Sequence, residues 1–126
     1  MVVRHGRILV IRRSRFVVAP GAFCLPGGGI EPGESEAETL VREFREELGA
    51  TIRPERRLWE TMTAWHVHLA WWLGDLDPDA QLVPNPAEVE SVHWYTPAEM
   101  APLPNLLEGN QRFLLALAAG QIDLVL

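Results

Sequence analysis

The chain has 126 residues and a formal net charge of −6, with 48% hydrophobic and 22% charged residues. This composition excludes an intrinsically disordered chain, and the length suits one domain over residues 1–126. Cys24 is the single cysteine, which excludes an internal disulfide. The acidic balance disfavours binding to a nucleic-acid backbone. No apolar run reaches the roughly 18 residues of a membrane span and no signal core follows the first Met, so we expect a cytoplasmic protein without a membrane partner.

Two strands are expected near the start, at residues 7–13 (RILVIRR) and 22–25, because both are rich in apolar, strand-forming side chains. The first begins so early that little room is left for an N-terminal element ahead of it. A loop rich in glycine and proline follows at residues 26–33.

The pattern after this loop predicts a helix over residues 35–48. Ser35 and Glu38 form a capping box, and Gly49 is a stop signal. The apolar residues between them recur at spacings of three and four: Ala37, Leu40, Val41, Phe44 and Leu48. One face of this helix is therefore expected to lie against a core.

Three further strands are expected at residues 57–64, 66–76 and 89–96. Thr96 and Glu99 form a second capping box with Pro97 between them, which predicts a short helix. A final helix is expected over residues 105–119, with Asn105 as its cap. Strands and helices in this order indicate a layered α/β domain with a mixed sheet.

The first helix carries an acidic patch, because Glu43, Glu46 and Glu47 stand at i, i+3 and i+4. A solvated acidic face is the simplest explanation for such a patch. No lysine on this helix relieves the repulsion between the three charges. Two details argue against a solvated face: the glutamates lie in the last turns, where the helix dipole disfavours anions, and the helix is preceded by a glycine loop able to bring backbone close to a ligand. Three hard oxygen donors on one face suit Mg²⁺ or Mn²⁺, so we expect the three carboxylates to converge on one cation.

Residues 28–50 read GGIEPGESEAETLVREFREELGA. This segment resembles the Nudix box, whose seven fixed positions are matched here by Gly28, Glu34, Arg42, Glu43, Glu46, Glu47 and Gly49. At about 7% usage per residue, a chance match is on the order of one in 10⁸ per starting position. Phe44 and Ala50 depart from the usual aliphatic residues but stay apolar, so the departures concern packing.

The resemblance implies the Nudix α/β/α sandwich with a mixed β-sheet. It implies Mg²⁺-dependent hydrolysis, with Mn²⁺ as a substitute, of a pyrophosphate bond in a nucleoside diphosphate linked to another moiety, by metal-activated water. It further assigns the metal to three glutamates, helped by the carbonyl of Gly27, and makes Glu34 and Arg42 a supporting pair in the catalytic machinery. The three glutamates are Glu43, Glu46 and Glu47.

The general base stays open between Glu46 and Glu43 inside the box and Glu88 or Glu90 outside it. Either outside residue could be a base, a ligand or part of a solvated strand end. For substrate contacts we consider two groups of side chains. Trp71 and Trp72 must point to opposite faces of a strand, so that one of them, with Trp71 as the candidate, could face the substrate. His66 and His68 alternate onto one face, with His66 as the candidate, although strand aromatics are more often core.

Two other classes of function remain in view. A catalytically silent nucleotide-binding or regulatory module on a Nudix scaffold is the alternative, and the intact set of box glutamates argues against it. A phosphate-binding loop of the P-loop type is also considered, but the glycine-rich loop of this chain lacks the Lys-Ser/Thr ending of a P-loop.

Residues 65–68 read Trp-His-Val-His. They therefore carry neither the proline that marks ADP-ribose enzymes nor the tyrosine that marks diadenosine polyphosphate enzymes. The nucleotide derivative and the oligomeric state stay open.

Overall fold

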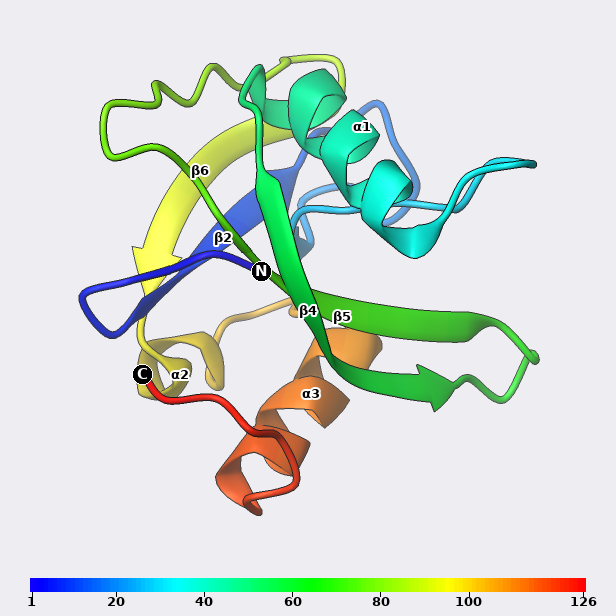
Figure 1. The fold of residues 1–126 in the computed structure, drawn as a ribbon, viewed down its shortest axis with the longest axis vertical. Helices are drawn as coiled ribbons and strands as arrows, with labels where there is room; N and C mark the ends of the chain where they lie inside the picture. The colour runs from blue at the N-terminus through cyan, green and yellow to red at the C-terminus, as the bar shows by residue number, and fades with distance from the viewer.

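A computed structural model describes all residues, 1–126, as two antiparallel sheets and three helices (Figure 1). The elements in chain order are β1 (Val3–Arg4), β2 (Arg7–Arg13), β3 (Phe23–Cys24), α1 (Glu36–Leu48), β4 (Arg53–Met62), β5 (His68–Asp75), β6 (Val89–Tyr95), α2 (Pro97–Met100) and α3 (Glu108–Ala118). The structure contains no helix with the length and hydrophobicity that a membrane span requires.

Strand β2 is the centre of the larger sheet. It pairs with β6 from Ile8 opposite Tyr95 to Arg13 opposite Val89, and it also pairs with β1 and β3. Four consecutive residues of β2, Ile8–Ile11, are fully buried. A strand that is apolar on both sides must be covered on both sides, and alternation of its side chains divides them between two cores.

The two cores define the layers of the fold. Leu9 and Ile11 pack with α1 residues, including Phe44, whereas Ile8 and Val10 pack with α3 residues, including Phe113. The helices α1 and α3 therefore cover opposite faces of β2, and the hairpin β4–β5 completes the structure between them (Figure 1). This α/β/α layering confirms the expected fold class. All pairings between named strands are antiparallel, and the parallel component is an isolated bridge between Phe23 and Leu106.

Helix α1 begins and ends where the sequence predicts. Ser35 accepts from the backbone N–H of Glu38 at 3.1 Å, and the Glu38 carboxylate accepts from the N–H of Ser35 at 3.0 Å. Gly49 adopts a left-handed conformation with φ of 60°, as a helix-ending glycine does. These caps fix the direction of the helix that carries the acidic patch.

Strand β4 spans Arg53–Met62 and so begins four residues before the strand expected at residues 57–64. Two further features of the fold differ from the expectations. Strand β1 was not predicted: it pairs with β2 through a turn at His5 and Gly6, both with positive φ. The expectation that Asn105 caps the last helix is wrong, because α3 begins at Glu108 with Leu107 as its cap residue and no side-chain cap bond. Asn105 instead uses its carbonyl to accept from the N–H of Phe23 at 3.0 Å, which ties it to β3.

Candidate functional site

Glu47 is a charged residue on the buried side of α1. It is 6% exposed, close to the apolar residues that fix the helix on the sheet. Its Oε1 accepts from the backbone N–H of Gly27 at 2.9 Å. Burial raises the pKa of this carboxyl to about 8, against the effect of the Gly27 bond, and the negative charges of Glu43 and Glu88 raise it further. A carboxylate in this place is costly to ionise unless a cation joins it.

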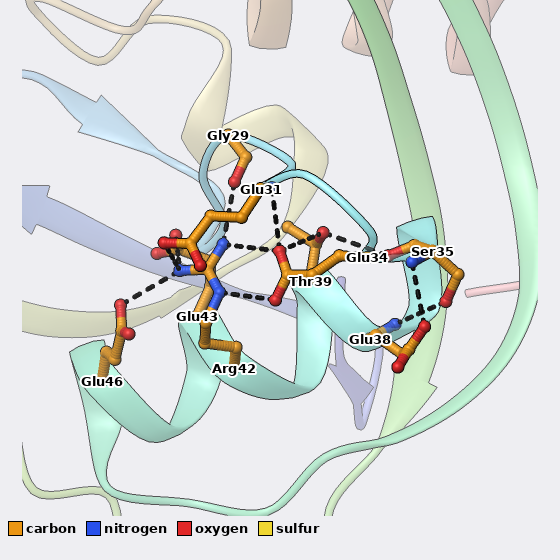
Figure 2. Close-up of polar contacts among 9 residues, drawn as sticks. All are labelled: Gly29, Glu31, Glu34, Ser35, Glu38, Thr39, Arg42, Glu43 and Glu46. Atoms are coloured by element: carbon orange, nitrogen blue, oxygen red, sulfur yellow. Dashed lines mark hydrogen bonds and ion pairs between the residues drawn. The ribbon is translucent and has the colours of Figure 1, made fainter.

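Arg42 holds three glutamates at once (Figure 2). Its Nε and Nη2 donate to the two oxygens of Glu34 at 2.7 and 3.0 Å, in a bidentate arrangement. Its Nη1 donates to Glu43 at 2.8 Å and to Glu46 at 3.2 Å, and its Nη2 also donates to the carbonyl of Gly29 at 2.8 Å. The expected pair of Glu34 and Arg42 is therefore present. The helix has no lysine, but the positive charge of Arg42 offsets the repulsion between Glu43 and Glu46.

Glu34 connects the glycine-rich loop to the helix. Besides Arg42, it accepts from the hydroxyl of Thr39 at 3.0 Å and from the N–H of Glu31 at 2.9 Å (Figure 2). The bonds from Arg42 are the main cause that lowers the pKa of Glu34 to about 2. Glu34 therefore stays ionised and keeps the loop in register with the helix, which is a positioning role.

The carboxylate of Glu43 packs closely against the glycine-rich loop at Gly28. A Cβ atom on Gly28 would collide with the carboxylate of Glu43, so the absence of a side chain at this position makes the close approach possible. Burial raises the pKa of Glu43 even though Arg42 lowers it, and the charges of Glu46 and Glu88 add to the rise. Glu43 is thus the second desolvated carboxylate of the site.

The structure distinguishes the two glutamates outside the box. The Oε2 atom of Glu88 is buried and is the one buried side-chain nitrogen or oxygen without a hydrogen-bond partner. The negative charge of Glu88 raises the pKa of both Glu43 and Glu47, so Glu88 belongs to the same cluster. Glu90 forms an exposed ion pair with Arg12 at 3.3 Å instead. An orphaned buried carboxylate oxygen is uncommon and requires an explanation such as an ion.

The carboxylates do not form a ready metal cage. No group of three or more His, Cys, Asp or Glu side chains is arranged to hold a metal ion. Glu43 and Glu46 meet at Nη1 of Arg42, whereas Glu47 turns to Gly27, so the expected convergence of all three on one point is not present. The guanidinium provides the positive charge at this position. Hard oxygen donors, burial and the orphaned oxygen of Glu88 nonetheless fit a divalent cation.

Two candidates for substrate contact lie away from this cluster. Trp71 is 7% exposed and stacks on Phe113 in the core at 5.7 Å between ring centroids, so its ring is not available to a substrate. His66 has a φ of 60° and lies in the turn between β4 and β5, so it does not share a strand face with His68, which pairs with Glu60 at 2.6 Å. No hydrogen bond or ion pair joins either histidine to the glutamate cluster.

Two residues near the site carry no sequence signal. Asn110 on α3 accepts from the N–H of Leu25 at 2.8 Å, two residues before Gly27, and so supports the loop from the opposite layer. Arg13 lies close enough to Glu47 to oppose the rise in its pKa. A shallow groove of about 600 Å³ runs along α1 towards Pro54, and Glu34, Arg42 and Glu46 are among the residues that line it.

The comparisons with known proteins identify the family. The family model described as the NUDIX domain matches residues 1–117. The chain is 33% identical over 106 residues to the NAD-capped RNA hydrolase NudC of Stutzerimonas stutzeri and 30% identical over 112 residues to that of Pseudomonas entomophila. Each alignment covers 82% of this chain but 37% of the relative, so the chain spans little more than a third of the length of these curated relatives.

Solved structures show the same fold. The solution structure of the E. coli ORF135 protein aligns with a TM-score of 0.73 and 26% identity, covering 96% of this chain and 86% of that one. The crystal structure of the MutT protein from Methanosarcina mazei Go1 aligns with a TM-score of 0.78 and 22% identity, covering 96% and 90%. From the family match over residues 1–117, the chain belongs to the Nudix family.

Proposed function

We propose that this chain is a divalent-metal-dependent pyrophosphohydrolase, which cleaves the phosphoanhydride bond of a nucleoside diphosphate linked to another moiety. One observation carries the proposal: Glu43, Glu47 and Glu88 form a desolvated acidic cluster that a single arginine does not neutralise. Perturbed carboxylates of this kind are typical of functional sites. Membership of the Nudix family supports the reaction class.

The cluster supplies the residues that would hold Mg²⁺ or Mn²⁺. We assign Glu43, Glu47 and Glu88 as the principal ligands, with the carbonyl of Gly27 as an additional one. When bound, the metal neutralises the diphosphate and lowers the pKa of a water molecule. Gly27 then has two roles, because its N–H already fixes the orientation of the Glu47 carboxylate.

Glu46 is the best-placed general base. Its side chain is 49% exposed, against 12% for Glu43, and its one partner is Arg42 at 3.2 Å. Its carboxylate can therefore accept a proton from an incoming water. The water oxygen forms a bond to phosphorus, the bridging P–O bond breaks, and the two products each carry one phosphate. Arg42 and Glu34 are positioning residues, because they fix the loop and two of the glutamates.

The relatives favour one substrate class. Proteins named NAD-capped RNA hydrolases align with 82% of this chain. We therefore propose a dinucleotide joined by a central pyrophosphate, either free or as the 5′ end of an RNA. This revises the expectation against nucleic acid, since the net charge of −6 is a sum over the whole surface and allows local contact. The intact set of box glutamates argues against the catalytically silent alternative.

Hydrolysis of NAD and of a 5′-NAD-linked oligoribonucleotide tests the proposal. With Mg²⁺ or Mn²⁺, chromatography and mass spectrometry are expected to show nicotinamide mononucleotide as a product of both substrates. Excess EDTA should abolish turnover, and added metal should restore it. Full turnover in EDTA would contradict the metal assignment. If the protein cleaves neither substrate with metal present, the proposed substrate class is contradicted.

A further inference from the structure

The loop between β2 and β3, residues 14–22, is anchored to the segment that carries Glu88. Ser14 is 3% exposed; its N–H donates to the carbonyl of Glu88 at 3.0 Å, and its hydroxyl donates to the carbonyl of Ala87 at 2.9 Å. The N–H of Phe16 in turn donates to the Ser14 hydroxyl oxygen at 3.2 Å. These bonds hold the first residues of the loop beside the acidic cluster.

Two arginines flank Ser14, and neither has an acidic partner. Of the eleven basic residues, all arginine, six form ion pairs: Arg7, Arg12, Arg42, Arg53, Arg57 and Arg112. Arg13 uses its Nε to donate to the carbonyl of Val18 at 2.7 Å. Arg15 donates no hydrogen bond within the protein, and its guanidinium carbon lies 4.8 Å from the centroid of the Phe16 ring. The donors of Arg15 are therefore free for a ligand.

The apolar side chains of the same loop are also uncovered. Phe16 is 68% exposed and Val18 is 84% exposed, whereas other large apolar residues of the chain are buried in its cores. An arginine stacked on an aromatic ring offers two kinds of contact side by side. The planar guanidinium of the arginine can donate two hydrogen bonds to a phosphate, and the aromatic ring can stack on a nucleobase. Proteins that bind single-stranded nucleic acid combine these two contacts.

Charge explains why such a loop would be needed here. A polyanion that approaches Glu43, Glu47 and Glu88 is repelled except where a metal binds its diphosphate. Positive charge beyond the metal must therefore come from the protein, and the β2–β3 loop places Arg15, which forms no ion pair, next to the Glu88 segment. A phosphate chain that continues past the diphosphate needs this charge, whereas a free dinucleotide does not.

We propose that the β2–β3 loop binds the ribonucleotide strand attached to the pyrophosphate, with Arg15 contacting a phosphodiester and Phe16 stacking on a base. The inference rests on the proposed function and adds the residues that distinguish an RNA-linked substrate from a free dinucleotide. It requires no contact between the loop and the bond that is cleaved.

The experiment compares wild type with Arg15→Gln and Phe16→Ala on NAD and on a 5′-NAD-linked oligoribonucleotide. Both variants are expected to lose about 5- to 100-fold in kcat/KM on the RNA-linked substrate and to keep wild-type kcat/KM on NAD. Arg112→Gln, which removes an exposed positive charge on α3, is the matched control and should behave as wild type on both. Binding of a fluorescent single-stranded oligoribonucleotide, followed by anisotropy, should weaken and become less salt-dependent in Arg15→Gln.

The outcomes separate the two proposals. Equal losses on both substrates would place the loop at the dinucleotide itself and would overturn the inference, as would unchanged kinetics on the RNA-linked substrate. If wild type cleaves neither substrate, the proposed function fails, but the anisotropy titration still tests the loop. Oligoribonucleotide binding that is the same in wild type and Arg15→Gln would then contradict it.

Discussion

Two arginine-centred clusters on this chain look alike in a diagram and differ in physical setting. Arg53 pairs with Asp75 at 3.0 Å and Asp77 at 2.6 Å, and all three side chains are about half exposed or more. Arg42 is 21% exposed and pairs with Glu34 and Glu43, which are 17% and 12% exposed. The first cluster lies in water, where such pairs contribute little and require no further explanation.

The Arg42 cluster has more negative charge than its arginine can balance. Burial raises the pKa of Glu43 and Glu47, and Glu88 keeps an unpaired buried oxygen nearby. Such an arrangement reduces the stability of the metal-free fold. The comparison indicates that ion pairs on a solvated surface reflect solubility and local order, whereas unbalanced buried carboxylates indicate a ligand that supplies the missing positive charge.

The largest contrast is expected between Glu47→Gln and Asp75→Asn. Glutamine keeps the carbonyl oxygen that accepts from Gly27 but removes the charge that binds metal, so turnover should fall by at least about 100-fold. Asp75→Asn removes a charge from the exposed cluster and should leave turnover unchanged. Steady-state kinetics with saturating Mg²⁺ checks both variants. Comparable activity in the two would remove the distinction between the clusters.

A second contrast uses two glutamates that are two residues apart. Glu88→Gln should reduce turnover by about 10- to 100-fold, because Glu88 joins the buried cluster. Glu90→Gln should have almost no effect, because Glu90 pairs with Arg12 on the surface. The same kinetic assay applies. If Glu90→Gln were the more damaging change, our placement of the outside carboxylate would be incorrect.

The arginines themselves give a third test. Arg42→Lys keeps the charge but loses the bidentate contact with Glu34 and the separate contacts with Glu43 and Glu46. We expect about a 10-fold loss of turnover and a lower melting temperature, against no measurable change in turnover for Arg53→Lys. A loss of turnover in both variants, or in neither, would show that the geometry of Arg42 does not matter.

The smallest expected effect is on the pH dependence of stability without metal. The pKa of Glu47 is about 8 in the folded protein, above its value of 4.5 in the unfolded chain. The contribution of protonated Glu47 to the free energy of unfolding is therefore complete below about pH 4.5 and is lost as the pH rises through 8. The melting temperature of wild type in EDTA, measured relative to that of Glu47→Gln, should therefore fall by a few degrees between about pH 5 and 8. The difference between the two proteins isolates Glu47, because other groups with shifted pKa values, such as the buried amine of Met1, are common to both. A difference that stays constant over this range would contradict the assignment. The low pKa of Glu34, about 2, acts in the opposite direction but only below pH 4.5.

Local sequence patterns predicted most of the fold. The capping boxes at Ser35 and Thr96 and the spacing of apolar residues on α1 depend on nearby residues, and the structure confirms these features. Strand β1 is only two residues long, too short to show a period. The start of α3 was placed wrongly because Asn105 bonds to β3, a partner distant in the sequence.

The site shows the same division. The box resemblance predicted that Arg42 and Glu34 would pair, and the structure contains that pair. Glu88 and Glu90 lie at a register shift between β2 and β6, beside the backbone bond from Ser14 to Glu88, and no local pattern reveals either feature. The burial of Trp71 likewise follows from the position of Phe113 on α3.

Direct binding of Mn²⁺ tests the central claim, that this buried acidic cluster is retained because it binds a divalent cation. Titration of wild type, Glu47→Gln and Asp75→Asn can be followed by the electron paramagnetic resonance signal of free Mn²⁺. The account predicts saturable binding to wild type and Asp75→Asn with the same affinity, and at least about 10-fold weaker binding to Glu47→Gln. Equal affinity in all three proteins, or no saturable binding to wild type, would contradict it.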